Sequence, residues 1–317
     1  MYTYIIKRTV AALILALTVA TIVFLALYLV PGDPAVMLLS VGGVEPPEAA
    51  VLALRQELGL DRPVVLQYLT FLGGLLQGDL GRSFSNNGTV WSTIAIRLPR
   101  TLELIGFATV ISLAIGVPAG VAAALRQGRF VDRAFSFAAS VQMSLPIFVT
   151  GTAMVYVFAQ RLGWVPAGGY VSFSDNPIRH VVLVLMPALA ISVGFSAIIF
   201  RMARATVASV LTKDWVRTAR AKGISEKRIR RWHIVRNSLG PVATIVGLEM
   251  GALLGGSVLV EYVFNYPGLS GFLVTAIENR DYPQIRGTVL VIAFLFIFLN
   301  LLVDLLYMVL DPRVRSQ

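Results

Sequence analysis

The stretch VVLVLMPALAISVGFSAIIF, residues 181–200, decides the fold class. It contains no charged side chain, and a helix of about 20 apolar residues crosses a hydrocarbon layer of about 30 Å. Five further apolar stretches have a comparable length: residues 9–30, 101–125, 135–158, 242–263 and 288–308. The sequence therefore predicts an all-α integral membrane protein with six transmembrane helices.

The overall composition agrees with a membrane protein. Of the 317 residues, 56% are hydrophobic and 14% are charged, and the mean hydropathy is +0.77. A soluble domain of this size cannot hide so much apolar surface in its core. Because the chain has no cysteine, disulfides, thiolate metal sites and cysteine nucleophiles are excluded. Cysteine usage therefore leaves the redox compartment open.

The first apolar stretch has two interpretations. Lys7 and Arg8 would suit the basic start of a cleavable signal peptide. However, the apolar part is too long for one and runs into VPGDP without a small-residue cleavage site. We interpret residues 9–30 as the first span.

Basic residues fix the expected orientation. An even number of spans places both termini on one side, together with the loop around Arg126–Arg133 and the basic run from Arg201 to Arg236. These segments hold most of the 27 basic residues, so the positive-inside rule predicts that this side is cytoplasmic. We expect both termini in the cytoplasm and a large periplasmic segment between the first and second helices.

Four parts of the chain follow from this topology: an N-terminal helix (1–30), a periplasmic segment (31–100), a five-helix core (101–310) and a cytoplasmic tail (311–317). Within the periplasmic segment, PPEAAVLALRQELG predicts a short helix that begins at proline and ends at Gly59. RPVVLQYLTFLGGLL predicts an amphipathic helix on the membrane interface or on the other spans. No internal repeat is visible, which disfavours an inverted-repeat secondary transporter.

The chain carries no recognisable catalytic or nucleotide site. A phosphate-binding loop needs lysine after glycine, and none of the four lysines follows a glycine. The topology places His180 and His233 on opposite sides of the membrane, so they cannot share a metal ion. We therefore expect no catalytic residue, no metal site and no cofactor in this chain.

Acidic residues inside the spans are functional candidates because each costs about 2.5–3.5 kcal/mol at a helix centre on insertion scales. Glu103 and Glu261 lie near the outer ends, where they are expected to reach water. Asp304 lies near the inner end, where an ion pair with a cytoplasmic arginine is expected. Glu249 is deeper. We group Glu249, its neighbour Met250, Glu261 and Asp304 as the candidate pathway or gate residues.

Glu249 lies beside a ridge of small residues. Gly247, Gly251 and Gly255 recur every fourth residue, which lets another helix approach closely in lipid. At 100° per residue, Glu249 points about 200° away from the flanking glycines. It faces either a watery pathway or a partner that satisfies it by an interhelical hydrogen bond, and both interpretations stay open.

The most basic interior segment, DWVRTARAKGISEKRIRRWHIVRNSLGP (214–241), predicts helix, turn, helix. Gly223 suits a left-handed helix end, Ser225 and Glu226 suit the start of a second helix, and Pro241 suits the start of the next span. The segment could lie on anionic lipid or bind a partner protein. Nucleic acid is a weaker alternative because aromatic residues are almost absent from the segment.

Small residues in the first helix of this segment favour a protein partner over anionic lipid, but they do not decide between the two. Thr218, Ala219 and Ala221 would let the first helix lie close in a groove of another protein.

These motifs together resemble one family. The motifs that carry the resemblance are RTARAKG followed by RNSLGP, LVPGDPA after the first span, FNYPGLSG before the last span and LLYMVLDPRVR at the end. Through them the chain resembles the membrane permease subunits of bacterial peptide and nickel ABC importers, of the dipeptide/oligopeptide permease B type. Each motif alone is weak, but the set is specific and covers nearly the whole chain. The resemblance implies the type I (MetI-like) importer fold.

In that family the loop, here residues 203–241, forms a coupling helix on a cytoplasmic ATPase subunit. The resemblance assigns the "EAA" positions to Arg217, Thr218 and Ala219 and the invariant glycine to Gly223. The chain departs from the general motif, because arginine and threonine replace glutamate and alanine and the closing proline is displaced to Pro241. The expected ATPase-coupling residues are Arg217, Thr218, Ala219, Arg220, Ala221, Lys222, Gly223, Ile224 and Ser225.

The resemblance also implies the partners. They are a second homologous permease, two ABC ATPase subunits that bind ATP and Mg²⁺, an extracytoplasmic substrate-binding protein and the lipid of the bacterial cytoplasmic membrane, with no nucleic acid. The implied cargo is short peptides, with nickel, glutathione or another small solute as alternatives. An ion-coupled secondary transporter that uses Glu249 or Asp304, and a non-transporting scaffold, are the alternatives from other classes.

Overall fold

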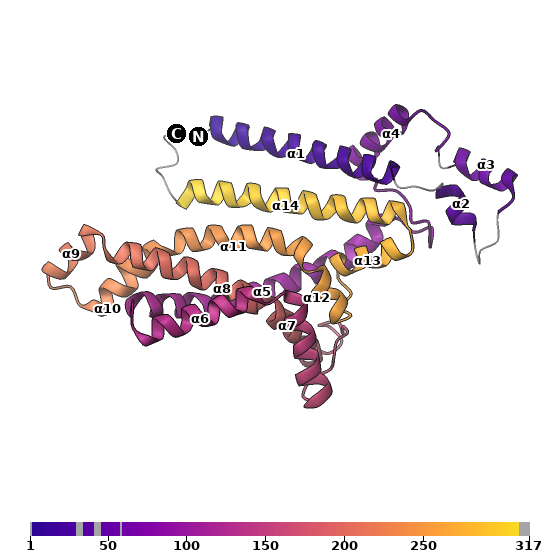
Figure 1. Cartoon of the computed structure of the whole chain (residues 1–317). Helices are drawn as coiled ribbons and strands as arrows, with labels where there is room; N and C mark the ends of the chain where they lie inside the picture. The colour runs from indigo at the N-terminus through magenta and orange to yellow at the C-terminus, as the bar shows by residue number, and fades with distance from the viewer. Residues whose placement is uncertain (1, 30–33, 41–45, 58, 311–317) are drawn as a thin grey trace. The chain divides into compact units, whose positions relative to one another are not determined.

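A computed structural model describes residues 2–29, 34–40, 46–57 and 59–310 of the chain (Figure 1). Within these ranges the chain is almost entirely helical and has no strand, only an isolated antiparallel bridge between Arg82 and Thr89. Contacts divide the chain into two units, which are described separately. The first comprises residues 1–12, 97–272 and 294–317, and the second comprises residues 13–96 and 273–293.

Five helices among the described residues are long and apolar enough to cross a membrane. They are α1 (Tyr2–Tyr28), α5 (Val90–Leu125), α8 (Pro177–Leu211), α11 (Arg236–Gly256) and α14 (Tyr282–Leu310). Each contains most of one predicted apolar stretch. The prediction of an all-α membrane protein is therefore confirmed, with five spans or with six if a bent helix pair counts as one.

The bent pair is the third predicted stretch, and it is not one straight helix. Helix α6 (Phe130–Ser144) ends before Pro146, and α7 (Ile147–Met154) then continues as a π-helical segment, η2 (Val155–Arg161). The two parts meet at 96°. Proline disfavours helical backbone in the residue before it, and Leu145 is extended at φ −89° and ψ 121°. Pro146 then precedes the first turn of the new helix.

The fifth predicted stretch also differs in its ends. Helix α11 begins at Arg236, six residues earlier than expected, and runs through Pro241 to Gly256. After Ser257 a short helix, α12 (Val258–Val263), covers the remainder. The other short helices are α2 (Pro34–Leu39), α3 (Glu48–Glu57), α4 (Val64–Leu76), α9 (Asp214–Ala221), α10 (Glu226–Arg228) followed by a π-helical turn η3 (Ile229–Val235), and α13 (Leu269–Glu278).

Both helices predicted between the first two spans are present in the second unit. Gly59 follows α3 with φ +66°, a conformation that favours glycine. On α4, Tyr68 and Phe71 pack against Phe24 of α1 with ring centroids 5.3 and 5.6 Å apart. The Tyr68 hydroxyl also hydrogen-bonds the Thr21 hydroxyl at 2.7 Å. The aromatic side of α4 therefore lies on α1, whereas Val65, Leu66, Leu69 and Leu76 of α4 are exposed.

Helix α8 lies at the centre of the first unit, where α5, α6 and α11 run beside it (Figure 1). Phe195 and Ile199 of α8 pack with Val242 and Val246 of α11, all buried. Toward the C-terminal end of α8, Arg204 donates two hydrogen bonds to Asp132 of α6, at 2.5 and 2.9 Å. This ion pair fixes α6 to α8.

Two glycines of α5 allow its backbone to approach α8 closely. A Cβ added to Gly116 would lie 2.7 Å from the Ser196 carbonyl oxygen, and one added to Gly120 would lie 2.8 Å from that of Phe200. These are backbone atoms, which cannot move aside as a flexible side chain can. The pair is spaced four residues apart, as in other close helix contacts in lipid.

We expect Gly120→Ala to destabilise the protein, because the added methyl group would force α5 and α8 apart. Overpacking of this kind costs about 1–3 kcal/mol. The measurement is the apparent Tm of the purified protein in detergent. Gly106→Ala on the same helix is the matched control, because a Cβ there has nothing within 4 Å. An equal Tm for the two variants would show that the close contact contributes nothing.

Candidate functional site

Helix α9 of the basic segment is anchored by one apolar face. Val216 and Ala219 are buried, and they pack with Val207 and Val210 of α8 and with Ile229 of η3. Ala219 therefore serves this chain's own core rather than an outer surface. The predicted helix over the start of the segment is confirmed, and its inner face fixes its position on the first unit.

The predicted left-handed turn after α9 is also present. Gly223 has φ +76°, and its N–H donates to the Arg220 carbonyl oxygen at 2.9 Å. The next N–H, of Ile224, donates to the Ala219 carbonyl oxygen at 3.2 Å. A side chain at Gly223 would meet nothing within 4 Å, so the requirement for glycine is one of backbone conformation and not of space.

The second helix of the segment is shorter than expected and has a different start. Ser225 precedes α10, but its side chain makes no capping hydrogen bond. Glu226 instead accepts a hydrogen bond from Arg220 at 2.8 Å and lies 4.0 Å from Arg230. Beyond α10 the chain continues without a break through η3 into α11.

The outer face of α9 and its turn is exposed and basic. Its exposed members are Arg217, Thr218, Arg220, Ala221, Lys222, Gly223 and Ser225. The ion pairs on this face, Arg217 with Asp214 at 3.7 Å and Arg220 with Glu226 at 2.8 Å, are largely in solvent and contribute little stability. We call these seven residues the α9 basic face. They are available to a partner, while Ala219 is buried and Ile224 is half-buried against the same apolar cluster.

Four predicted pathway residues have different surroundings. Glu249 on α11 is partly exposed, and no hydrogen bond or ion pair reaches its carboxylate from the part of the chain that the structure describes. Met250 packs against the cluster between α8 and α11. The side chain of Asp304 lies outside the described residues. Glu261 behaves differently from all three.

The expectation that Glu261 reaches water is wrong, because its side chain is only 1% exposed. One oxygen accepts hydrogen bonds from the Thr101 hydroxyl at 2.7 Å and the Ser257 hydroxyl at 3.4 Å. The other accepts from the Gly271 N–H at 2.6 Å. Gly268 lies against the carboxylate so closely that a Cβ there would overlap it. Glu261 thus holds the turn between α12 and α13 in place.

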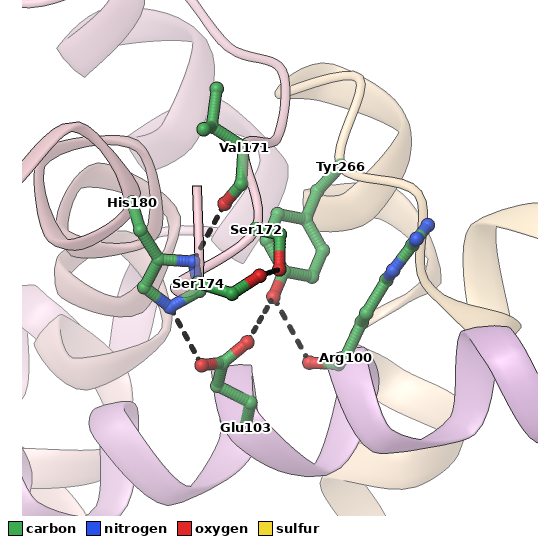
Figure 2. Close-up of polar contacts among 7 residues, drawn as sticks. All are labelled: Arg100, Glu103, Val171, Ser172, Ser174, His180 and Tyr266. Carbon is green, nitrogen blue, oxygen red and sulfur yellow. Dashed lines mark hydrogen bonds and ion pairs between the residues drawn. The ribbon is translucent and has the colours of Figure 1, made fainter. Parts of the chain in front are cut away.

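The same turn is bound to α5 at further points. Thr101 accepts a hydrogen bond from the Leu269 N–H at 2.8 Å while it donates to Glu261. The Tyr266 hydroxyl lies 3.1 Å from the Arg100 carbonyl oxygen and 3.3 Å from a Glu103 oxygen (Figure 2). Burial, and then the charge of Glu103, raise the pKa of this hydroxyl, so it keeps its proton and remains a donor.

Figure 2 shows that His180 connects this region to α8. Its Nδ1 lies 2.8 Å from the Val171 carbonyl oxygen, and its Nε2 lies 2.7 Å from Glu103. Since a carbonyl oxygen only accepts, Nδ1 must carry a proton. Nε2 then either donates to an ionised Glu103 or accepts from a protonated one. In either arrangement one proton lies between Nε2 of the buried His180 and the partly exposed carboxylate of Glu103.

Sequence reasoning missed this network. Sequence reasoning places Glu103 at the water interface and considers His180 only with His233, for a shared metal ion or a paired acid–base role. The two residues are 77 positions apart, and no local pattern pairs them. Within the described residues no cluster of three or more His, Asp or Glu side chains suits a metal ion. The His233 side chain lies outside those residues.

The chain matches two protein families along almost its whole length. Residues 116–316 match the binding-protein-dependent transport system inner membrane component, and residues 1–105 match the N-terminal region of such membrane components.

Curated relatives are similar over their full lengths. A protein of Brucella suis named as a peptide permease is 40% identical over 99% of each chain. One of Sinorhizobium fredii named as a peptide ABC transporter permease is 36% identical over 98% of this chain and 99% of its own. The glutathione transport system permease of Escherichia coli is 38% identical over 99% of each.

Solved structures support the fold. The inward-facing MetNI methionine ABC transporter has a TM-score of 0.54 at 18% identity, covering 71% of this chain and 96% of that chain. An amino acid ABC transporter crystallised with histidines has a TM-score of 0.50 at 19% identity, covering 70% and 94%. These likenesses show the MetI-like fold of ABC importer permeases. From its sequence and its fold, the chain belongs to the family of binding-protein-dependent transport system inner membrane components.

Proposed function

We propose that this chain is one of two membrane-spanning subunits of an ATP-driven importer that carries short peptides across the bacterial cytoplasmic membrane. The observation that carries the proposal is the construction of α9. It offers a basic face outward, is fixed by Val216 and Ala219 on its inner face, and leads into the helix that bears Glu249. Peptide cargo is supported by the names of the Brucella and Sinorhizobium relatives.

The proposed assembly divides the work among subunits. A second homologous permease completes the pathway, two cytoplasmic ATPases bind ATP and Mg²⁺, and an extracytoplasmic binding protein delivers cargo. The termini, the tail 311–317 and the loop 203–241 lie in the cytoplasm, and residues 31–100 lie outside. The positive-inside distribution of basic residues supports this orientation.

In the proposed mechanism, the ATPases push on the α9 basic face when they close on ATP. Because Val216 and Ala219 pack on α8 and η3, α9 cannot move without moving its neighbours. The displacement passes along η3 into α11 and changes the exposure of Glu249 and Met250, with Asp304 as a third proposed pathway residue. We assign Glu261 to the gate through the turn that it holds.

Two alternatives differ in cargo and in energy source. Glutathione as the cargo is supported by the name of the Escherichia coli relative, and nickel is a further alternative cargo of the same type of importer. Glu249 favours an ion-coupled transporter, because it is an acidic residue within a span and its carboxylate has no partner among the described residues. The energy source separates the ion-coupled transporter from the proposed importer, and the transported solute separates peptides from glutathione and nickel.

We expect uptake of labelled trialanine only into proteoliposomes that contain the complete complex, binding protein and ATP. Collapsing the proton gradient with an ionophore should leave the initial rate unchanged, because hydrolysis supplies the energy. Vesicles with this chain alone are the control. Uptake by the chain alone, driven by a proton gradient and indifferent to ATP, would contradict the proposal.

We expect Gly223→Val to uncouple hydrolysis from transport, because a β-branched residue strongly disfavours φ +76° and would distort the end of α9. The matched control is Gly128→Val, which has the same φ of +76° and equally open surroundings in another loop. The measurement is trialanine transported per ATP hydrolysed. Equal ratios of trialanine transported to ATP hydrolysed in the two variants would show that α9 does not transmit the movement of the ATPases.

A further inference from the structure

Glu249 occupies an unusual position in α11. It lies 3 residues past the midpoint of a 21-residue spanning helix, so it is only about 4–5 Å from the centre of that helix along its axis. No donor among the described residues reaches its carboxylate. By contrast, the buried carboxylates Asp132 and Glu261 both accept several hydrogen bonds.

The neighbours of Glu249 show which side of α11 it takes. It lies seven residues after Val242, and at 100° per residue it is about 20° from Val242, which packs on α8. The face toward α14 is different: a Cβ on Gly251 would lie 3.2 Å from Phe296. On the other flank, Leu248 is 43% exposed. Glu249 therefore lies at the margin where the α8 contact gives way to an open apolar face.

Contact with lipid does not account well for a carboxylate on this open face so near the centre of the helix. A carboxylate at a helix centre costs about 2.5–3.5 kcal/mol on insertion scales, and a near-isosteric glutamine would avoid the charge. A cation or water must therefore meet the carboxylate in the working assembly. Its helix is continuous with η3 and α10, which follow the turn after α9, so a displacement of that region would also displace the carboxylate.

The cargo offers a suitable cation. Peptides and glutathione, the substrates in the names of the relatives, differ in length and side chains but share a free α-ammonium group. A charge-assisted hydrogen bond between an ammonium and a carboxylate is among the stronger polar contacts, and it is less weakened away from bulk water. A site of this kind would accept peptides of many sequences, because it binds the α-ammonium group that all of them share.

Building on the proposed function, we propose that the Glu249 carboxylate binds the α-ammonium group of the cargo within the translocation pathway. It is a specificity-determining residue for primary amines at the amino end of a short peptide. Met250 and the apolar neighbours of Glu249 leave the rest of the cargo unselected.

The test compares trialanine with N-acetyl-trialanine in proteoliposomes containing the complete complex. The separate binding protein has its own preference between these probes, but that factor is the same for every permease variant. We expect Glu249→Gln to lower the preference for trialanine, expressed as the ratio of the two transport efficiencies, by about tenfold. Glu249→Asp should retain most of the preference, and Glu57→Gln, an exposed change on α3, should retain all of it.

A second measurement needs no variant. In the wild-type complex, a water-soluble carbodiimide should label the Glu249 carboxyl, with mass spectrometry as the readout. Trialanine should slow this labelling at least several-fold, while N-acetyl-trialanine should not. This measurement decides the question even where Glu249→Gln fails to assemble.

Several results would overturn the inference. An unchanged preference in Glu249→Gln, including an equal loss of transport for both probes, or equal protection by both probes would assign Glu249 to another role, such as pairing with a cation of the second permease. In either case, ATP-driven uptake by the wild-type complex would leave the proposed function standing. Absence of that uptake would overturn the proposed function and the inference together.

Discussion

A carboxylate removed from water needs hydrogen-bond donors for its oxygens, and the buried Glu261 is of this kind, with the partly exposed Glu103 nearby where α5, α8 and the α12–α13 turn meet. Glu261 accepts hydrogen bonds from Thr101, Ser257 and Gly271, and Glu103 accepts one from Tyr266 and shares one with His180. Each donor belongs to a different turn or helix. Satisfying the two acids therefore requires those segments to stay together.

Packing of small residues complements these polar contacts. In lipid, moving an apolar side chain from the hydrocarbon into a helix contact provides little hydrophobic free energy, so helices associate through close packing and hydrogen bonds. Gly116 and Gly120 bring α5 against α8, and Gly247 and Gly251 bring α11 against Val303 and Phe296 of α14. Gly255, the third glycine of that ridge, has nothing within 4 Å. The first unit is thus held by backbone proximity in some places and by enclosed polar groups in others.

The sequence predicted features that depend on neighbouring residues and missed those that depend on distant ones. Apolar length located the spans, and Gly223 located the turn after α9. Pro146 breaks its span, whereas Pro187 and Pro118 stay inside helices, so proline alone could not predict the bend. The burial of Glu261 depends on Thr101, 160 residues away. The spacing of Gly116 and Gly120 was visible and carried the same signal as the ridge on α11.

The continuity of α10, η3 and α11 has a geometric consequence. Glu249 lies 13 residues beyond Arg236, or about 20 Å at 1.5 Å per residue. If the rod pivots about its base, an inclination of about 10° sweeps the carboxylate through an arc of about 3.5 Å. That arc exceeds the length of a hydrogen bond. A modest rocking at the α10 end would therefore suffice to make or break one polar contact at Glu249.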